Sequence, residues 1–354
     1  MKALILSGGR GTRLRPLTHT SAKQLIPVGG KPILFYGIEA IRNAGIEDVG
    51  IVIGETGEEI KNAVGNGSKF NVKVSYIFQP KPLGLAHAVK ISREFIGDDP
   101  FIVFLGDNLI KDDLRKFREY FERKNSNSLI LLSRVPNPQD FGVAELKDGK
   151  VIRLIEKPKN PPSEFALVGV YFFDKNIFKA CEEIKPSWRN ELEITDAIQW
   201  LIDKNLVVDA LLIKGWWKDT GKPEDLIEAN RFVLEDLEPE IEGKIINSKI
   251  IGKVKVENGA QIIDSSIRGP VVIKSGTKII KSYIGPFTSI QEDCYIENME
   301  IEDSIIMEKS EIRDIKGRIE MSIIGKEVKI FQDHSRPRIH RFILGDHSDV
   351  RLVE

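Results

Sequence analysis

A glycine-rich turn directly after the first apolar strand is the strongest constraint on this chain. The strand is expected over Lys2–Leu6, and Ser7-Gly8-Gly9-Arg10-Gly11-Thr12-Arg13-Leu14 follows at once. Glycines let backbone N–H groups approach a phosphate chain, because no side chain stands in the way. Arg13 and Lys23 add positive charge beside this loop. The pattern therefore predicts a binding site for a nucleoside triphosphate.

Two commoner phosphate-binding loops do not match this turn. A Walker A loop needs Gly-x-x-x-x-Gly-Lys-Ser/Thr, and no glycine in the chain is followed by Lys-Ser or Lys-Thr. The dinucleotide fingerprint Gly-x-Gly-x-x-Gly is met at Gly9 and Gly11, but Leu14 stands where the third glycine belongs.

Composition narrows the class of protein. The 52 Lys and Arg residues nearly cancel the 53 Asp and Glu residues, which argues against a protein that coats nucleic acid or a membrane surface. Cys181 and Cys294 are too few for a disulfide framework and are not spaced as a zinc site. The short N-terminal apolar run is neither a signal peptide nor a membrane span, so a cytoplasmic protein is expected.

Residues 1–238 alternate short β-branched runs with helical stretches, which predicts a Rossmann-like, doubly wound α/β sheet domain. The predicted strands are Lys2–Leu6, Val49–Ile53, Val72–Phe78, Phe101–Leu105 and Ser128–Arg134. The predicted helices are Ile33–Ala44, Gly57–Val64, Leu85–Phe95 and Lys111–Arg123. Ligands bind beyond the carboxyl ends of the strands in such sheets. We therefore expect the glycine loop and Asp107 to face one crevice.

The periodicity of apolar residues changes from about Lys244. Short Ile/Val runs recur roughly every 16 to 22 residues with glycine or polar corners between them, as in Ser265-Ser266-Ile267-Arg268-Gly269. This period is typical of a parallel β-helix, whereas a β-sandwich would show period-two alternation and hairpin turns. We predict a second domain over residues 239–354, a β-helix with a C-terminal tail, joined through the acidic stretch Leu234–Glu240.

Polar residues after other strands suggest the rest of a site. Asp107 follows an apolar strand, and Asp219 follows the apolar stretch Val207–Trp217, so two carboxylates could hold Mg²⁺ together with phosphate oxygens. Gln79 carries an amide that can both donate to and accept from a pyrimidine imide, and Gly84 would let a base lie flat on the backbone.

Glu156 and Lys157 form a further pair of interest. Glu156 could accept hydrogen bonds from vicinal sugar hydroxyls, and Lys157 could hold a phosphate monoester. Taken together, the segments resemble the sugar-phosphate nucleotidyltransferases, in particular the long glucose-1-phosphate thymidylyltransferases that end in a left-handed β-helix. The motifs that carry the resemblance are Gly8–Lys23, Gln79–Gly84, Leu105–Asn108, Phe141–Val143 with Glu156–Pro158, Val168–Tyr171, Glu191–Asp196 and Trp217–Gly221.

The resemblance implies a role for each matching residue. Arg13, Lys23 and Lys157 would be catalytic, and Asp107 and Asp219 would be the Mg²⁺ ligands. The nucleotide-binding residues would be Leu6, Gly8, Gly9, Gly11, Thr12, Gln24, Gln79 and Gly84. The sugar-phosphate-binding residues would be Gly142, Glu156, Lys157, Val168 and Tyr171.

The implied substrates are dTTP and glucose 1-phosphate, with UTP as the alternative nucleotide. The sugar phosphate would attack the α-phosphorus of dTTP in a single in-line displacement that expels pyrophosphate. Thymine and uracil differ by one methyl group, which is worth only about 1–3 kcal/mol of discrimination. A non-catalytic regulatory subunit is a rival reading, but such relatives lose the metal aspartate, the arginine or the lysine, and this chain has all of them.

The role of the β-helix is left open by the sequence. In related two-domain proteins the fold can be an acetyl-CoA-dependent acyltransferase, which needs a histidine base. His19 and His87 precede the repeats, and His334, His340 and His347 follow them. We therefore expect a role in assembly or regulation, with a homo-oligomer formed through the flat walls of the β-helix.

Overall fold

The computed structural model describes residues 1–332 and 348–350. The chain divides into two compact units. The first contains Met1–Arg10, Ser21–Leu25 and Ile33–Asp219, and the second contains Gly11–Thr20, Ile26–Pro32 and the chain from Thr220 onward. The predicted boundary at residue 238 stays a prediction, and most of the predicted C-terminal tail lies outside the described residues.

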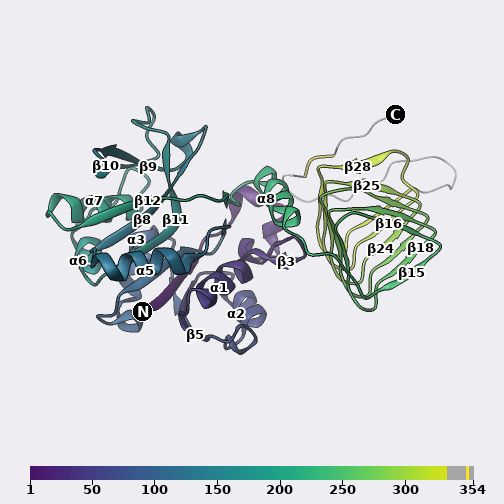
Figure 1. Cartoon of the computed structure of the whole chain (residues 1–354), viewed down its shortest axis with the longest axis horizontal. Helices are drawn as coiled ribbons and strands as arrows, with labels where there is room; N and C mark the ends of the chain where they lie inside the picture. Colours follow the sequence, from purple (N-terminus) through teal and green to yellow (C-terminus); the bar gives the residue numbers. More distant parts are fainter. Residues whose placement is uncertain (333–347, 351–354) are drawn as a thin grey trace. The chain divides into compact units, whose positions relative to one another are not determined.

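The first unit is built on a mixed sheet with the strand order β10-β9-β11-β6-β1-β4-β5, and β8 joins β12 to β11. Strands β6, β1, β4 and β5 run parallel to one another, while β11 runs antiparallel to β6 and β8. This arrangement confirms the predicted doubly wound mixed sheet (Figure 1). The strands are β1 (Lys2–Ser7), β4 (Asp48–Ile53), β5 (Lys73–Phe78), β6 (Phe101–Leu105), β8 (Ser128–Arg134), β9 (Gly142–Lys147), β10 (Lys150–Glu156), β11 (Phe165–Phe173) and β12 (Val208–Leu212).

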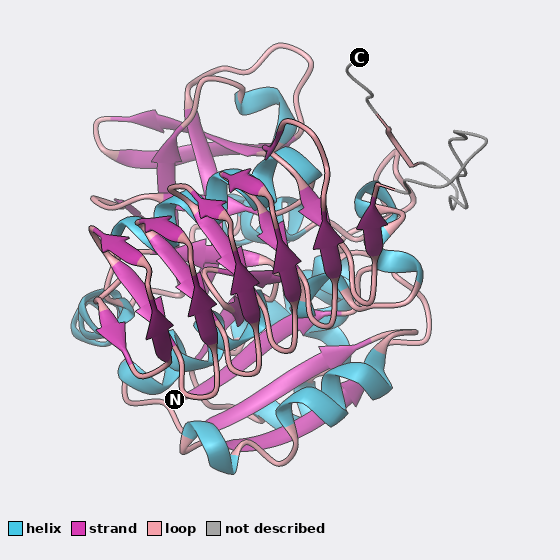
Figure 2. Ribbon diagram, turned by 90° about the vertical axis from the view of Figure 1, so that its right-hand side faces the viewer, coloured by secondary structure: helices cyan, strands magenta, loops and turns pink. Residues whose placement is uncertain are grey.

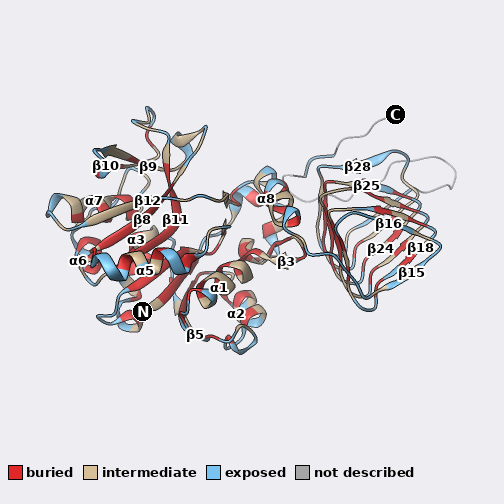
Figure 3. Ribbon diagram, in the orientation of Figure 1, coloured by how far each residue is buried: buried red, intermediate tan, exposed pale blue. Residues whose placement is uncertain are grey.

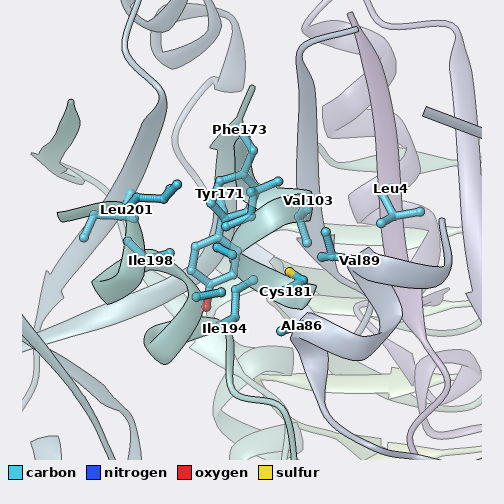
Figure 4. Packing of buried hydrophobic residues seen from close by; sticks show 14 of the residues in the cluster. Leu4, Ala86, Val89, Val103, Tyr171, Phe173, Cys181, Ile194, Ile198 and Leu201 are labelled. Atoms are coloured by element: carbon cyan, nitrogen blue, oxygen red, sulfur yellow. The ribbon is translucent and has the colours of Figure 1, made fainter. Parts of the chain in front are cut away.

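Helices cover both faces of this sheet because the side chains of each strand alternate between the faces. Leu4 and Leu6 join one core with α3, α6 and α7, and Ala3 and Ile5 join the other with α1, α2 and α5. Figure 4 shows part of the first core, and Figure 3 shows buried residues concentrated in strands such as β8 and β11. The helices are α1 (Ile33–Asn43), α2 (Gly57–Val64), α3 (Leu85–Ile91), α4 (Arg93–Ile96), α5 (Leu114–Lys124), α6 (Asn176–Glu183) and α7 (Ile194–Asp203).

Two helices differ from the sequence prediction. The expected helix Leu85–Phe95 is divided at Ser92, whose Oγ donates to the carbonyl oxygen of Ala88 at 2.7 Å and competes with the helical backbone. The expected helix Lys111–Arg123 begins only at Leu114, because Asp113 caps it by accepting a hydrogen bond from the N–H of Arg115 at 2.9 Å.

The second unit contains a left-handed parallel β-helix with three walls in the described residues. The first wall is β14 (Glu240–Ile241), β17 (Val254–Val256), β20 (Val271–Ile273), β23 (Thr288–Ile290), β26 (Ile305–Ile306) and β29 (Ile323–Ile324). The second is β15 (Lys244–Ile246), β18 (Gln261–Ile263), β21 (Lys278–Ile280), β24 (Tyr295–Glu297), β27 (Glu311–Arg313) and β30 (Lys329–Phe331). The third is β16 (Lys249–Ile251), β19 (Ser266–Arg268), β22 (Tyr283–Ile284), β25 (Glu300–Glu302) and β28 (Arg318–Glu320).

Stacked isoleucines fill the interior of the β-helix. Along the second wall Ile262, Ile279 and Ile296 pair in parallel register, and each is fully buried. Equivalent positions are 17 residues apart in most coils, with spacings of 16 and 18 near the end. Figure 2 shows the strands of successive coils lying side by side in rows. The predicted β-helix is therefore confirmed, but its period is 16 to 18 residues and not 16 to 22. The wider expectation arose because the apolar runs at Ile284 and Ile305 lie on different walls, in β22 and β26.

Further segments of the second unit surround α8 (Pro223–Glu235). The hairpin of β2 (Pro27–Val28) and β3 (Lys31–Pro32) is bound to this helix, because Asn230 Oδ1 accepts a hydrogen bond from the N–H of Gly29 at 2.7 Å. Asn230 Nδ2 donates to the carbonyl oxygen of Phe287 in the β-helix, also at 2.7 Å. One fully buried amide thus joins the hairpin, the helix and the β-helix.

Truncation of one stacked isoleucine tests the coil packing. We expect Ile279→Ala to destabilise the β-helix by about 2–5 kcal/mol, because it removes buried methyl groups and leaves a cavity. The measurement is the change in the urea unfolding midpoint followed by circular dichroism. Lys278→Ala, on the outer side of the same strand, should change stability by no more than about 0.5 kcal/mol. Equal effects of the two substitutions would contradict the inward stacking of Ile279.

Candidate active site

Adjacent parallel strands bring the glycine turn and Asp107 together. Leu6 of β1 pairs with Leu105 of β6, and the N–H of Gly106 donates to the carbonyl oxygen of Leu6 at 3.0 Å. The glycine turn after β1 and Asp107 after β6 therefore begin at neighbouring positions on the same edge of the sheet. This agrees with the expectation that both face one edge of the sheet.

The glycines Gly8 and Gly9 are required by close neighbours. A Cβ atom on Gly8 would lie 2.8 Å from Gln79 Oε1, and one on Gly9 would lie 3.3 Å from Lys23 Cε. Both distances are shorter than ordinary van der Waals contact, so any larger residue would displace Gln79 or Lys23. The absence of side chains thus keeps these two polar groups next to the turn.

Lys23 and Asp107 form an ion pair, with only 16% and 13% of their side chains exposed. Burial alone would raise the pKa of Asp107, but the Lys23 ammonium and its hydrogen bond outweigh that effect and lower the pKa. Asn108 Nδ2 also donates to Asp107 Oδ1 at 3.2 Å. Asp107 is therefore an ionised carboxylate at neutral pH.

A second carboxylate is brought to the same place by a short two-stranded ladder. Strand β13 (Trp217–Asp219) pairs antiparallel with β7 (Asn108–Ile110), so that Asp219 lies opposite Asn108. Trp217 Nε1 donates to Asn108 Oδ1 at 2.6 Å and fixes this register. Asp219 therefore lies across the ladder from the neighbour of Asp107. Carboxylate oxygens suit a hard divalent cation, and the predicted role of the two residues as ligands of one metal ion stays a prediction.

A metal held here would draw its other ligands from substrate. Within residues 1–332 and 348–350, no three His, Cys, Asp or Glu side chains gather as a metal-binding group. Two carboxylates with phosphate and water oxygens are a common way to hold Mg²⁺. The donor set therefore fits a metal that enters with a phosphate-bearing substrate.

Gln79 and Gly84 lie at the two ends of the loop that follows β5. The N–H of Gln79 donates to the carbonyl oxygen of Ile53 at 2.9 Å, which continues the sheet by one residue. Gly84 has φ +103°, and a Cβ there would lie 2.4 Å from the carbonyl oxygen of Leu192. Leu192 also donates its N–H to the carbonyl oxygen of Leu83 at 2.8 Å. The loop is thus held against the chain segment that carries Leu192.

Gln24 and Leu6 are the remaining predicted nucleotide-binding residues of the first unit. Gln24 is almost fully buried, and its Oε1 has no hydrogen-bond partner among the described residues. A buried amide oxygen without a partner is costly, so this atom suits a ligand donor. Leu6 lies in the hydrophobic core beneath the turn, and its predicted contact with the nucleotide stays a prediction.

Glu156, at the end of β10, is the centre of the predicted sugar-binding group. Its Oε1 accepts a hydrogen bond from Arg189 Nη1 at 3.2 Å, and its Oε2 accepts one from the Thr195 hydroxyl at 3.3 Å. A Cβ on Gly142 would lie 3.2 Å from Glu156 Oε2. Gly142 and Glu156 therefore lie together, and their predicted contact with a sugar stays a prediction.

The carboxyl group of Glu156 lies in an unusual electrostatic environment. Burial raises the pKa of Glu156, and the neighbouring Glu193 carboxylate raises it further, against the opposing effect of Lys157 and Arg189. Lys157 has φ +42°, in the left-handed region, as do many corner residues of the β-helix such as Asp264 and Lys281. This backbone conformation therefore does not by itself distinguish Lys157 as a functional residue.

Val168 and Tyr171 have buried side chains. Val168 is fully buried in the core shared with α1, α2 and α5, so a contact between Val168 and sugar would have to come from its backbone. Tyr171 stacks on Phe173 with ring centroids 5.9 Å apart (Figure 4). Burial raises the pKa of the Tyr171 hydroxyl, and the carboxylates of Glu156 and Asp219 raise it further. The predicted sugar contacts of both residues stay predictions.

Gly11, Thr12 and Arg13 belong to the second unit, although they follow Arg10 directly in the chain. A Cβ on Gly221 would lie 2.9 Å from Arg13 Nη2, so the guanidinium packs against that backbone just before α8. The Thr18 hydroxyl donates to the carbonyl oxygen of Gly11 at 2.7 Å and closes the loop. The predicted contact of these residues with a triphosphate stays a prediction.

Sequence reasoning missed Arg189. Besides Glu156, this guanidinium binds Glu191 at 3.1 Å and lies 3.6 Å from the buried Glu193 carboxylate. Glu191 and Glu193 were noted as part of a motif, but the partner Glu156 is 33 residues away. Glu191 and Glu193, close by in the sequence, could have indicated that Arg189 pairs with carboxylates. The contact between Arg189 and Glu156 could only be found from the fold.

Comparisons with known proteins agree with this geometry. The family model described as nucleotidyl transferase matches residues 2–236. The glucose-1-phosphate thymidylyltransferase of Streptomyces griseus is 53% identical over 99% of both chains.

The chain belongs to the nucleotidyl transferase family.

Two solved structures resemble the chain. One, a protein assigned as a glucose-1-phosphate thymidylyltransferase from Bacillus anthracis in complex with a sucrose, has a TM-score of 0.64 and 36% identity, covering 68% of this chain and 98% of its own. The other, a UDP-glucose pyrophosphorylase complexed with UDP-glucose, has a TM-score of 0.59 and 29% identity, covering 65% and 96%.

Family membership fixes the general chemistry of this nucleotidyltransferase. Enzymes of this kind act on a nucleoside triphosphate and a sugar phosphate with a divalent metal ion. None of the helices in the described part of the chain is long and apolar enough to cross a membrane.

Substitution of Glu156 tests the burial of its carboxyl group. Because the folded-state pKa is raised above the ordinary 4.5, the folded protein binds this proton more tightly than the unfolded chain does. The contribution of Glu156 to stability therefore falls as the pH rises above 4.5 through the folded-state pKa. We expect the melting temperature of Glu156→Gln, relative to wild type, to increase from pH 4.5 to about pH 7.5.

Glu191→Gln is the matched control, because it also removes a carboxylate partner of Arg189. Differential scanning fluorimetry of the three proteins across this pH range gives the comparison. A relative melting temperature of Glu156→Gln that does not change with pH, or that changes no more than that of Glu191→Gln, would contradict the assignment.

Proposed function

We propose that the chain transfers a thymidylyl group from dTTP to α-glucose 1-phosphate, giving dTDP-glucose and pyrophosphate. The observation that carries the proposal is the largely buried ion pair of Lys23 and Asp107 beside Gly8 and Gly9, at the carboxyl ends of β1 and β6. The Streptomyces griseus relative, which spans the same length, is named for this activity.

The reaction needs alignment and charge neutralisation more than proton transfer. An oxygen of glucose 1-phosphate forms a bond to the α-phosphorus of dTTP, and the bond from that phosphorus to the bridging oxygen breaks, so that pyrophosphate leaves. The attacking phosphate is already anionic at neutral pH, so no general base is needed. Lys157 and Arg189 would hold the sugar phosphate beside Glu156, and Lys23 and Arg13 would hold the triphosphate.

The metal proposed for this site is Mg²⁺, with Asp107 and Asp219 as its protein ligands. When bound, Mg²⁺ neutralises phosphate charge and orients the phosphate chain. The lowered pKa of Asp107 supports this role, because a metal ligand must be ionised. Lys23, the present partner of Asp107, would then be free to bind a phosphate oxygen.

UTP is the second candidate nucleotide. The structural relative complexed with UDP-glucose favours it, and thymine and uracil present the same polar edge to Gln79. The full-length relatives named for thymidylyl transfer favour dTTP. The two nucleotides are compared directly in the test below.

No second activity is proposed for the β-helix. Residues 239–332 contain no histidine that could serve as the base for acyl transfer. Burial raises the pKa of the Cys294 thiol to about 11, so this cysteine is a poor nucleophile. Formation of a homo-oligomer through the β-helix stays a prediction. Charged metabolite substrates and two free, buried cysteines support a cytoplasmic enzyme.

The function is tested by measuring pyrophosphate release from α-glucose 1-phosphate and Mg²⁺ with dTTP, UTP, CTP, ATP and GTP in parallel. We expect release with dTTP and a weaker or comparable signal with UTP. Product identity is checked by mass spectrometry of the nucleotide sugar. Release with none of the five nucleotides would overturn the proposal.

Removal of Arg13 tests its role in charge stabilisation. We expect Arg13→Ala to lower kcat by about 10² or more, since it would remove a cation from the developing negative charge. Arg10→Ala is the matched control, because Arg10 lies in the same loop but is exposed and paired with Glu55 at 2.6 Å. Steady-state kinetics that give equal kcat values for both variants would contradict the role of Arg13.

A further inference from the structure

The side-chain amide of Asn108, the residue directly after Asp107, has an orientation that is fixed at both ends. Its Oδ1 accepts a hydrogen bond from the indole Nε1–H of Trp217 at 2.6 Å, and its Nδ2 donates to Asp107 Oδ1 at 3.2 Å. An indole N–H can only donate, and an ionised carboxylate can only accept. A reversed amide would set its NH₂ group against a donor and its oxygen against an anion. The observed orientation alone satisfies both neighbours.

The indole of Trp217 is itself held in place. The ladder of β13 with β7 sets the backbone of Trp217 opposite Ile110. The indole ring packs edge to face against Phe141, with ring centroids 5.2 Å apart. Asn108 is 2% exposed, so water has little access to replace the indole as a donor to its amide oxygen. The hydrogen bond from Trp217 therefore decides how the amide is turned.

Gly169 in β11 leaves the space that this amide occupies. A Cβ on Gly169 would lie 2.6 Å from Asn108 Oδ1 and 2.8 Å from Asn108 Cγ. Both distances are well below van der Waals contact, so any side chain at Gly169 would push the amide from its place. Residues 108, 169 and 217, which are far apart in the chain, thus meet at one buried amide group.

The Asn108 contact also determines how the Asp107 carboxylate is turned. Lys23 binds Oδ2 of this carboxylate and Asn108 binds Oδ1, so each oxygen has its own donor. In the proposed function Lys23 moves to a phosphate oxygen when the metal ion and the triphosphate bind. Of these two contacts, the one from Asn108 then stays and opposes rotation of the carboxylate.

We propose that Trp217 is a positioning residue that acts through Asn108 to hold the Asp107 carboxylate in the orientation needed for a divalent metal ion. Groups that hydrogen-bond to metal ligands orient them, and the loss of such a group typically lowers metal affinity by about 10- to 100-fold. This inference rests on the proposed function, in which Asp107 is a metal ligand.

The test measures how much Mg²⁺ strengthens the binding of dTTP in the absence of sugar phosphate, where no turnover occurs. Isothermal titration calorimetry gives the dissociation constant of dTTP with saturating Mg²⁺ and with EDTA. The ratio of the two constants is the gain due to Mg²⁺. Binding of Mg²⁺ to dTTP in solution is the same for every variant, so differences in the gain between variants report the contact between metal and protein.

We expect Trp217→Phe, which keeps an aromatic ring but removes the N–H, to reduce the gain by about tenfold. The affinity for dTTP in EDTA should stay near that of wild type, because the contacts of the nucleotide with the protein are unchanged. Gly169→Ala should reduce the gain in the same way, since its methyl group displaces the same amide.

Trp200→Phe is the matched control, because it also removes an indole N–H that donates to a side-chain oxygen, that of Glu183 Oε2 at 2.9 Å. It should keep the wild-type gain. The inference is overturned if Trp217→Phe also keeps that gain, or if this variant weakens dTTP binding equally with and without Mg²⁺, as a general structural defect would.

Melting temperatures identify a variant that does not fold, and the other variant then decides. A wild-type protein whose dTTP affinity does not respond to Mg²⁺ would overturn the metal site and this inference with it. Failure of the proposed function is distinct, since wild type would then release no pyrophosphate from dTTP and α-glucose 1-phosphate.

Discussion

The parallel pairing of β1 with its two neighbours is the constraint on which the active site depends. Because β4 and β6 flank β1 in the same direction, the chain leaves all three strands at one edge of the sheet. Strand β5 extends this edge by one more strand. The glycine turn, Asp107 and Gln79 follow β1, β6 and β5 respectively. Their proximity is thus a property of the sheet, and no loop has to reach far to assemble them.

The largely buried ion pair of Lys23 and Asp107 is better explained by the proposed chemistry than by a contribution to the stability of the fold. Taking two charges out of water costs several kcal/mol per ion, and the attraction between the partners often no more than offsets that cost. An apolar pair of similar volume would serve the fold as well. A cation and an anion that can exchange partners would serve the proposed reaction, in which a metal ion and a phosphate chain bind together.

Much of this arrangement could be predicted from local sequence patterns. The glycine turn, Asp107 after its strand and the repeating isoleucines of the β-helix each depend on residues close together in the chain. Arg189 could not be assigned in this way, because its partner Glu156 is distant in sequence. The contact of Trp217 with Asn108 also joins residues far apart in the chain, and no periodic pattern encodes it. The grouping of Gly11–Thr20 with the β-helix unit likewise depends on contacts far along the chain.

The regular coil of the β-helix sets how the domain can change in length. Inward residues recur every 17 positions in most coils, and the coils of 16 and 18 residues show that a difference of one residue is absorbed at a corner. An insertion inside a strand would instead turn its isoleucines outward. The domain can therefore lengthen or shorten by whole coils during evolution while its interior stays intact. A whole coil is therefore the unit to add or remove when the length of the β-helix is redesigned.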